Sequence, residues 1–203
     1  MARSAFIETP SQLLVVTLAE AKKHLRVSHT DDDDYITSLI HSSKLDVEKY
    51  CNIILMRTTV IQNADCWTDI GELYFSPVEN SGAISLTHIK YYDDANVPTQ
   101  QTWASSNYNF DNTSCPSRIG LMPNADLPGH ANMLNAIEVK YLVGFGAADL
   151  VPKLLKQCVL ILCGQWYENR QEAVIGRSVG TIPMTARYIM DKYKIRTMGL
   201  PTC

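Results

Sequence analysis

The chain has 203 residues, which is enough for one or two domains with a real hydrophobic core. Hydrophobic residues make up 46% of it and charged residues 19%, a balance that indicates a globular protein and excludes a disordered one. The formal net charge of −3 argues against a protein that wraps nucleic acid electrostatically, but not against one that surrounds DNA without gripping it.

The first residues show no secretory signal and no membrane span. The longest early apolar run, residues 13–16, is far shorter than the ~20 residues that a span needs. We therefore expect a protein without a membrane segment that is made in a cytoplasm. The six cysteines include no Cys-x-x-Cys pair, so we expect buried free thiols rather than a disulfide framework or a zinc site. These cysteines lie at positions 51, 66, 115, 158, 163 and 203.

Two helices are predicted near the start of the chain. Thr17 and Glu20 form a capping box, in which the hydroxyl and the carboxylate each bond the other residue's backbone amide. Apolar residues then recur at helical spacing, which predicts a short helix to about Val27. A second apolar stripe starts at Ile36 and predicts a long amphipathic helix to about Asn52.

Between residues 53 and 146 the apolar period changes to two, which is typical of strands. Strands are predicted at residues 84–91 and 108–110, and most clearly at 137–143, where apolar residues alternate with charged ones. Loops rich in Asn, Ser, Pro and Gly separate these segments.

The stretch "VPKLLKQCVLILCGQWYENRQEA" at 151–173 predicts a third helix, with Pro152 at its start. From Cys158 to Cys163 this helix is apolar on every side, so it needs neighbours all round. Those neighbours come either from its own chain or from other subunits. A last helix is predicted from about Pro183 to Tyr193.

This order of elements predicts an α+β fold: a small helical bundle, made of two N-terminal and two C-terminal helices, with an inserted antiparallel β region. We divide the chain into N-terminal helices (1–52), the inserted β region (53–146), and C-terminal helices with a docking tail (147–203).

The acidic run "DDDD" at 31–34 resembles a metal site only superficially. A calcium loop needs alternating ligands and a glycine at its sixth position, where this chain has Ile36. We expect these carboxylates to start the second helix instead, with one capping it and the others favouring its positive end.

Two further motifs fail as catalytic or phosphate sites. "GRSVG" at 176–180 matches a nucleophile elbow at Ser178, but a helix precedes it and the last histidine, His130, lies upstream. "GFGAAD" at 144–149 has Asp149 where the third glycine of a dinucleotide loop belongs, so we interpret its glycines as a turn. The residues predict no catalytic residues, no metal site and no cofactor.

Three stretches carry a family resemblance. Residues 17–52, "KYLVGFG" at 140–146 and the helix at 151–173 resemble head–tail connector proteins of tailed phages, also called adaptors or head completion proteins. This resemblance covers about a third of the chain. The β insertion is longer than in the compact all-helical members, so its contacts cannot be transferred.

The resemblance implies a structural virion protein, made in the host bacterial cytoplasm. It implies a cyclic homo-oligomer, expected to be dodecameric, docked beneath the portal protein of a DNA-filled head. The ring extends the DNA channel, lets DNA pass without sequence-specific binding, and presents a surface to a stopper or tail-completion protein.

Within this interpretation, "WYENR" supplies aromatic and arginine anchors for the subunit interface: Trp166, Tyr167 and Arg170. The C-terminal segment is basic in an acidic chain, so we expect Arg187, Lys192, Lys194 and Arg196 to dock on the portal. The alternative for that segment is a solvated helix face followed by a frayed end. Alternatives for the whole chain are another phage assembly factor, such as a tail-completion protein, and a serine hydrolase using Ser178.

Overall fold

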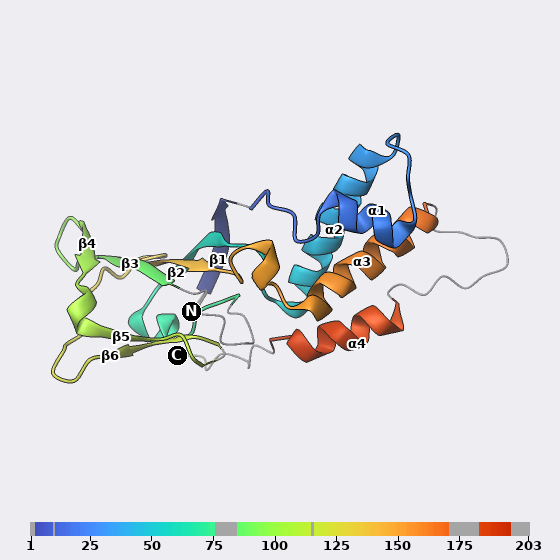
Figure 1. Ribbon diagram of the computed structural model, residues 1–203. Helices are drawn as coiled ribbons and strands as arrows, with labels where there is room; N and C mark the ends of the chain where they lie inside the picture. Colours follow the sequence, from blue (N-terminus) through green and yellow to red (C-terminus); the bar gives the residue numbers. More distant parts are fainter. Residues whose placement is uncertain (1–2, 10, 76–84, 115, 171–182, 196–203) are drawn as a thin grey trace.

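The computed structural model describes residues 3–9, 11–75, 85–114, 116–170 and 183–195. Figure 1 shows an elongated molecule with the helices at one end and the sheet at the other. This arrangement confirms the predicted α+β fold.

Four α-helices form the bundle: α1 (Leu18–Leu25), α2 (Asp33–Cys51), α3 (Lys153–Glu168) and α4 (Met184–Tyr193). Helices α1, α2 and α4 lie close to their predicted spans, whereas α3 ends at Glu168, before the predicted end at residue 173. Both bonds of the capping box at Thr17 are present. The first two helices end at Arg26 and Asn52, which adopt the left-handed conformation that closes a helix.

The main sheet has five antiparallel strands in the order β1-β2-β7-β3-β4. A separate hairpin pairs β5 with β6. The strands are β1 (Arg3–Thr9), β2 (Thr58–Ala64), β3 (Ser85–Tyr92), β4 (Gln100–Trp103), β5 (Tyr108–Asp111), β6 (Arg118–Leu121) and β7 (Ile137–Val143). Short 3-10 turns lie at η1 (Trp67–Ile70), η2 (Ser105–Asn107) and η3 (Ala148–Leu150).

Strand β1 is a difference from the sequence analysis, which predicted no strand before residue 53. It pairs with β2 over its whole length, with an irregularity between Ile7 and Thr9. Its apolar residues Ala5, Phe6 and Ile7 are consecutive rather than alternating, so no period of two was visible. The first part of the chain therefore contributes a strand to the sheet as well as two helices to the bundle.

The sheet buries one face and leaves the other open. Along β2 and β7 buried and half-buried residues alternate regularly. The buried face packs on Trp67 of η1, whose ring centroid lies 4.8 Å from that of Trp103, and on the β5–β6 hairpin below the sheet in Figure 1. The opposite face carries polar side chains, among them Glu138 and Lys140.

The bundle has a separate core around α3. Between Cys158 and Cys163, four residues are buried and Leu160 and Ile161 are half-buried, so none is exposed. Helices α1, α2 and α4 all pack against α3. One chain therefore supplies most of the neighbours that this apolar helix needs.

Candidate functional site

Hydrogen bonds to the Asp32 carboxylate connect the C-terminal end of α3 to the start of α2. The Tyr167 hydroxyl donates to Asp32 Oδ2 at 2.6 Å, and Arg170 donates to the same oxygen at 3.3 Å. The Arg170 guanidinium also lies over the rings of Tyr35 and Tyr167, 4.8 and 5.3 Å from their centroids. We call these four residues the aromatic clasp.

The hydrogen bond from Tyr167 lowers the pKa of Asp32, with Arg170 and His29 adding favourable charge against the effect of desolvation. The same bond raises the pKa of Tyr167. Asp32 occupies the N-cap position of α2, but its side chain makes no capping bond. The expectation that a carboxylate of this run caps the helix is therefore wrong for Asp32, because its oxygen is engaged by α3 instead.

The rest of the acidic run is also engaged in structure. Asp33 accepts from Lys22 Nζ at 2.6 Å, which ties α1 to α2. Asp33 and Asp34 both lie in the first turn of α2, as predicted for its positive end. Among the described residues, no group of three or more His, Cys, Asp or Glu side chains could hold a metal ion.

The three residues predicted for a subunit interface lie together at the end of α3. Trp166 is half-buried against the bundle core, and Tyr167 and Arg170 have partners within the same chain. The Arg170 side chain keeps 55% of its surface exposed. Their role in a subunit contact stays a prediction.

The basic residues of α4 gather around tyrosine rings. Lys194 Nζ lies 4.5 Å from the centroid of Tyr50, and Lys192 Nζ lies 4.4 Å from that of Tyr188. The Tyr50 hydroxyl donates to Asp191 at 2.7 Å, and this bond raises the pKa of Tyr50. Arg187 is exposed on the same helix. Arg196, Ser178 and the last residues of the chain lie outside the described residues.

Helix α4 and the residue that follows it are bound to the bundle by one backbone hydrogen bond and by hydrogen bonds from two thiols. The Ile195 amide donates to the Cys51 carbonyl at 2.9 Å. The Cys51 and Cys158 thiols bond the carbonyls of Met190 and Ala186, and burial raises the pKa of each thiol to about 12. The expectation of free buried thiols is confirmed for positions 51, 158 and 163.

A buried carboxylate links the bundle to the sheet. Glu48 Oε1 accepts from the Leu55 amide at 2.8 Å and lies 3.9 Å from Lys44 Nζ, which in turn donates to the Ser11 carbonyl at 3.1 Å. Burial raises the pKa of Glu48 despite the nearby ammonium. Sequence reasoning missed this arrangement, because a Lys and a Glu four apart on a helix usually form a solvated surface pair.

The two glycines of "GFGAAD" form the return from sheet to bundle. Gly144 and Gly146 have φ values of +102° and +100°. A Cβ atom on Gly144 would lie 2.6 Å from the Met56 carbonyl oxygen, and the Phe145 amide donates to Leu55 at 3.0 Å. The interpretation of this motif as a turn is confirmed.

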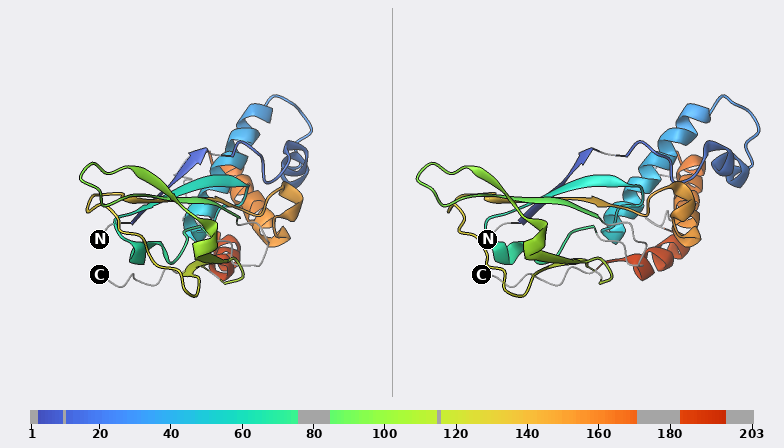
Figure 2. Two further views of the ribbon diagram at one scale, coloured as in Figure 1. Left: turned by 90° about the vertical axis from the view of Figure 1, so that its left-hand side faces the viewer. Right: turned by 60° about the vertical axis from the view of Figure 1, so that its left-hand side comes forward.

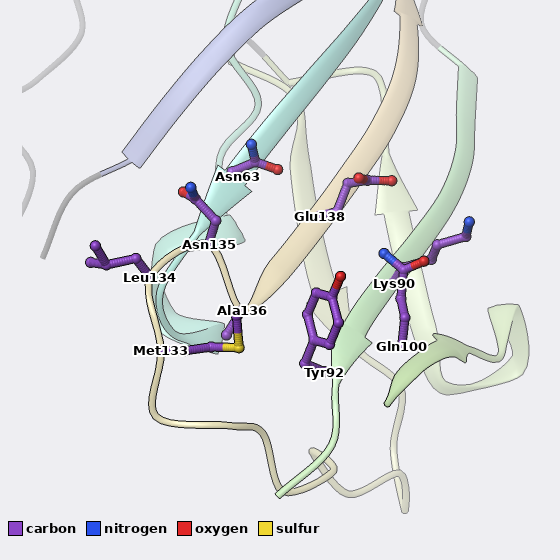
Figure 3. A pocket seen from close by; sticks show the side chains of 9 residues that line it. All are labelled: Asn63, Lys90, Tyr92, Gln100, Met133, Leu134, Asn135, Ala136 and Glu138. Atoms are coloured by element: carbon purple, nitrogen blue, oxygen red, sulfur yellow. The ribbon is translucent and has the colours of Figure 1, made fainter. Parts of the chain in front are cut away.

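Two pockets lie in the described part of the chain, one where the sheet meets the bundle and one at the far end of the sheet. One, of about 250 Å³, lies between β1 and α2. The other, of about 260 Å³, lies on the open face of the sheet. Figure 3 shows that Lys90 and Glu138 on this face, together with Asn63, line the second pocket beside the loop that carries Asn135. Such a lining can form hydrogen bonds, but it assembles no nucleophile with a base.

None of the described helices is long and apolar enough to cross a membrane.

Comparison with known proteins agrees with this architecture. Residues 15–102 match the model of the family described as "Phage gp6-like head-tail connector protein". This segment, which is less than half of the chain, is similar to the head–tail connector proteins. The resemblance predicted from the sequence is confirmed. Among curated proteins, none matches the chain significantly.

Solved structures share the fold of nearly the whole chain. A chain from the neck of an empty gene transfer agent (GTA) particle with C6 symmetry is 19% identical, with a TM-score of 0.73 over 98% of this chain and 100% of that one. A chain from the virion of a native GTA particle has the same identity and TM-score over 96% and 97%. A chain from a native GTA neck with C12 symmetry aligns over both full lengths, with a TM-score of 0.67 and 19% identity.

Proposed function

We propose that this chain is a structural virion protein that forms a ring beneath the portal, joins the DNA-filled head to the tail and extends the DNA channel. The match of residues 15–102 to head–tail connector proteins carries this proposal. The fold likeness to chains from GTA necks with C6 and C12 symmetry supports a cyclic arrangement, expected to hold twelve copies. The role is mechanical, so it requires no catalytic residue and no cofactor.

Deletion of the gene tests the role directly. A phage that lacks a connector should package DNA but fail to attach tails, so electron micrographs should show full heads beside free tails. Normal tailed particles would contradict the proposal. If the chain were a hydrolase using Ser178, the Ser178→Ala variant should fail to restore tailed particles to the deletion strain. The structural role predicts that this variant restores them fully.

The subunit interface is proposed to include the exposed surface of Trp166, Tyr167 and Arg170. Partial exposure of an arginine held between aromatic rings supports this, since such residues dominate interfaces. Trp166→Ala should lower the yield of infectious particles sharply, because it removes an aromatic side chain that also packs on the bundle. Normal yield from this variant would remove these residues from the interface.

Portal docking is proposed for the basic C-terminal segment, with Arg187, Lys192, Lys194 and Arg196 as its contacts. Because Ile195 is buried and bonded to Cys51, a truncation that leaves the fold intact must keep residue 195. Removal of residues 196–203, combined with Lys194→Ala, should leave a folded protein that no longer binds purified portals. Salt should weaken the binding of the intact chain. Equal attachment by the truncated protein would place docking elsewhere.

DNA is proposed to pass through the ring without sequence-specific binding, and the tail side is proposed to meet a stopper or tail-completion protein. The net charge of −3 supports a channel wall with few phosphate contacts. The site of action is the head–tail interface of the virion, after synthesis in the host cytoplasm. Tight binding of the purified protein to duplex DNA at physiological salt would contradict this channel.

A further inference from the structure

Two exposed apolar patches lie at the junction between bundle and sheet. The first, which we call the junction groove, is the pocket of about 250 Å³ between β1 and α2, with apolar walls from Ile7, Leu45 and Ile54. Leu45 is 51% exposed and Ile7 is 38% exposed. The pocket is also lined by the polar residues Ser11, Gln12, His41, Lys44, Glu48 and Thr58. The side chains of Lys44, Glu48 and Thr58 already have hydrogen-bond partners in the backbone, so the apolar side chains are the main contact that the groove offers.

The second patch, the junction knob, consists of Leu150 and Leu154. They are 61% and 46% exposed, on η3 and on the first turn of α3. Their neighbours Val151 and Leu155 are 2% and 0% exposed in the bundle core, so the backbone beneath the knob is fixed. A fixed backbone lets exposed leucines bind with little loss of conformational entropy.

Strand β1, which borders the groove, and the segment at 145–152, which leads to the knob, lie on opposite sides of α2 when the molecule is viewed along its long axis. The left view of Figure 2 looks along this axis from the sheet end. Strand β1 lies on one side, and the light-orange segment at 145–152 lies on the other, with α2 between them. A ring built from head-to-tail contacts needs this geometry, because each subunit must present two different surfaces on its two flanks.

One pair of opposite charges lies beside the two patches, and Lys153 is exposed next to Leu154 as well. Asp149 is exposed directly before Leu150, and Lys49 is exposed one helical turn after Leu45 on the same face of α2. Opposite charges beside apolar contacts favour the correct register between subunits.

We propose that the junction knob of one copy inserts into the junction groove of the next copy around the ring. This rests on the proposed connector function and identifies the partner as a second copy of this chain. Leu150 or Leu154 fills the groove against Ile7, Leu45 and Ile54, and Asp149 approaches Lys49. Because the contact joins two different surfaces, each copy can bind one neighbour through its knob and another through its groove. Repeated around a rotation axis, this contact closes into a ring in which every knob and every groove is occupied.

Photo-crosslinking in assembled particles tests the contact. A photoreactive amino acid in place of Leu45 should link to residues 149–157 of a second copy, identified by mass spectrometry of the crosslinked peptides. The reciprocal probe at Leu154 should link to residues 7–13 or 41–49 of a second copy. A probe at the exposed Lys23 of α1 serves as the control and should give neither product.

A second substitution makes the test specific. With the probe at position 45, Leu154→Asp should lower the crosslinked dimer about tenfold or more, because a charge replaces the leucine that enters the groove. Leu134→Asp is the matched control, since Leu134 is 75% exposed on a loop at the far end of the sheet, and it should leave the product unchanged. Circular dichroism of each purified variant verifies that the fold is retained.

The outcomes separate the two proposals. Crosslinks from position 45 to a portal, to a tail protein, or to another segment of this chain would overturn the groove–knob contact and leave the connector function standing. Absence of any crosslink in particles that contain the chain would also overturn it. If the chain is missing from particle necks altogether, the connector function itself fails.

Discussion

The bundle and the sheet region bury their apolar residues in different ways. In the bundle, α3 is surrounded by three helices of its own chain, and no residue from 158 to 163 is exposed. In the sheet region only one face is covered, and the other carries half-buried polar residues such as Lys140 and Glu138. Among the described residues, α3 is therefore covered on all sides, whereas only one face of the sheet is covered by a hydrophobic cluster.

The junction joins these two regions by specific contacts rather than by one continuous core. The apolar residues fall into two separate clusters, one in the bundle and one under the sheet. Between them lie the Glu48–Leu55 bond and the Gly144 turn. Substitutions in the bundle, at the return turn and at Glu48 should therefore affect the free energy of unfolding to different extents.

The largest effect is expected inside the bundle. Leu162 is 1% exposed on α3, so Leu162→Ala should lower the free energy of unfolding by about 2–5 kcal/mol. Urea denaturation followed by circular dichroism measures this change. Leu134→Ala is the control and should change stability by no more than about 0.5 kcal/mol, because Leu134 is 75% exposed. Equal effects of the two variants would mean that α3 is not packed by its own chain.

A smaller effect is expected at the return turn. Gly144→Ala should lower the free energy of unfolding by more than about 1 kcal/mol, since φ is +102° and the new Cβ would meet the Met56 carbonyl oxygen at 2.6 Å.

Gly120→Ala is the matched control, because a Cβ at that position meets nothing within 4 Å. It should be close to neutral in the same urea titration. Equal stability of both glycine variants would show that the turn can relax, and that the two regions are less rigidly joined than the contacts indicate.

The smallest effect is expected in the pH dependence of stability, through the buried carboxylate of Glu48. Burial raises the pKa of Glu48 above its unfolded value of 4.5, so the folded state holds this proton more tightly than the unfolded state does. The contribution of Glu48 to stability is then fully present below pH 4.5 and is lost as the pH rises through the raised pKa. Glu48→Gln should flatten this fall in a series of denaturation curves measured upward from pH 4.5.

Glu20→Gln provides a control of opposite sign. The backbone amide of Thr17 lowers the pKa of Glu20, so its contribution is present above pH 4.5 and is lost as the pH falls. If both variants changed the pH profile in the same direction, the assignment of Glu48 as the buried link would be wrong.

Local sequence patterns determined most of the secondary structure. The capping box at Thr17, the apolar stripe of α2 and the alternation in β7 each depend on residues within a few positions of one another, so the chain itself specifies them. The glycine turn at 144–146 was predictable for the same reason. The family resemblance, on which the proposed connector role rests, also came from linear motifs.

Contacts between distant segments were decided only by the tertiary structure. Strand β1 depends on a partner more than fifty residues away, and Asp32 accepts from Tyr167 and Arg170 instead of capping its own helix. Lys44 and Glu48 are buried only because β1, the linkers and α2 converge there. Spacing along the chain fixes which residues share a face of one element, but packing in three dimensions decides what that face meets and whether its charges leave water.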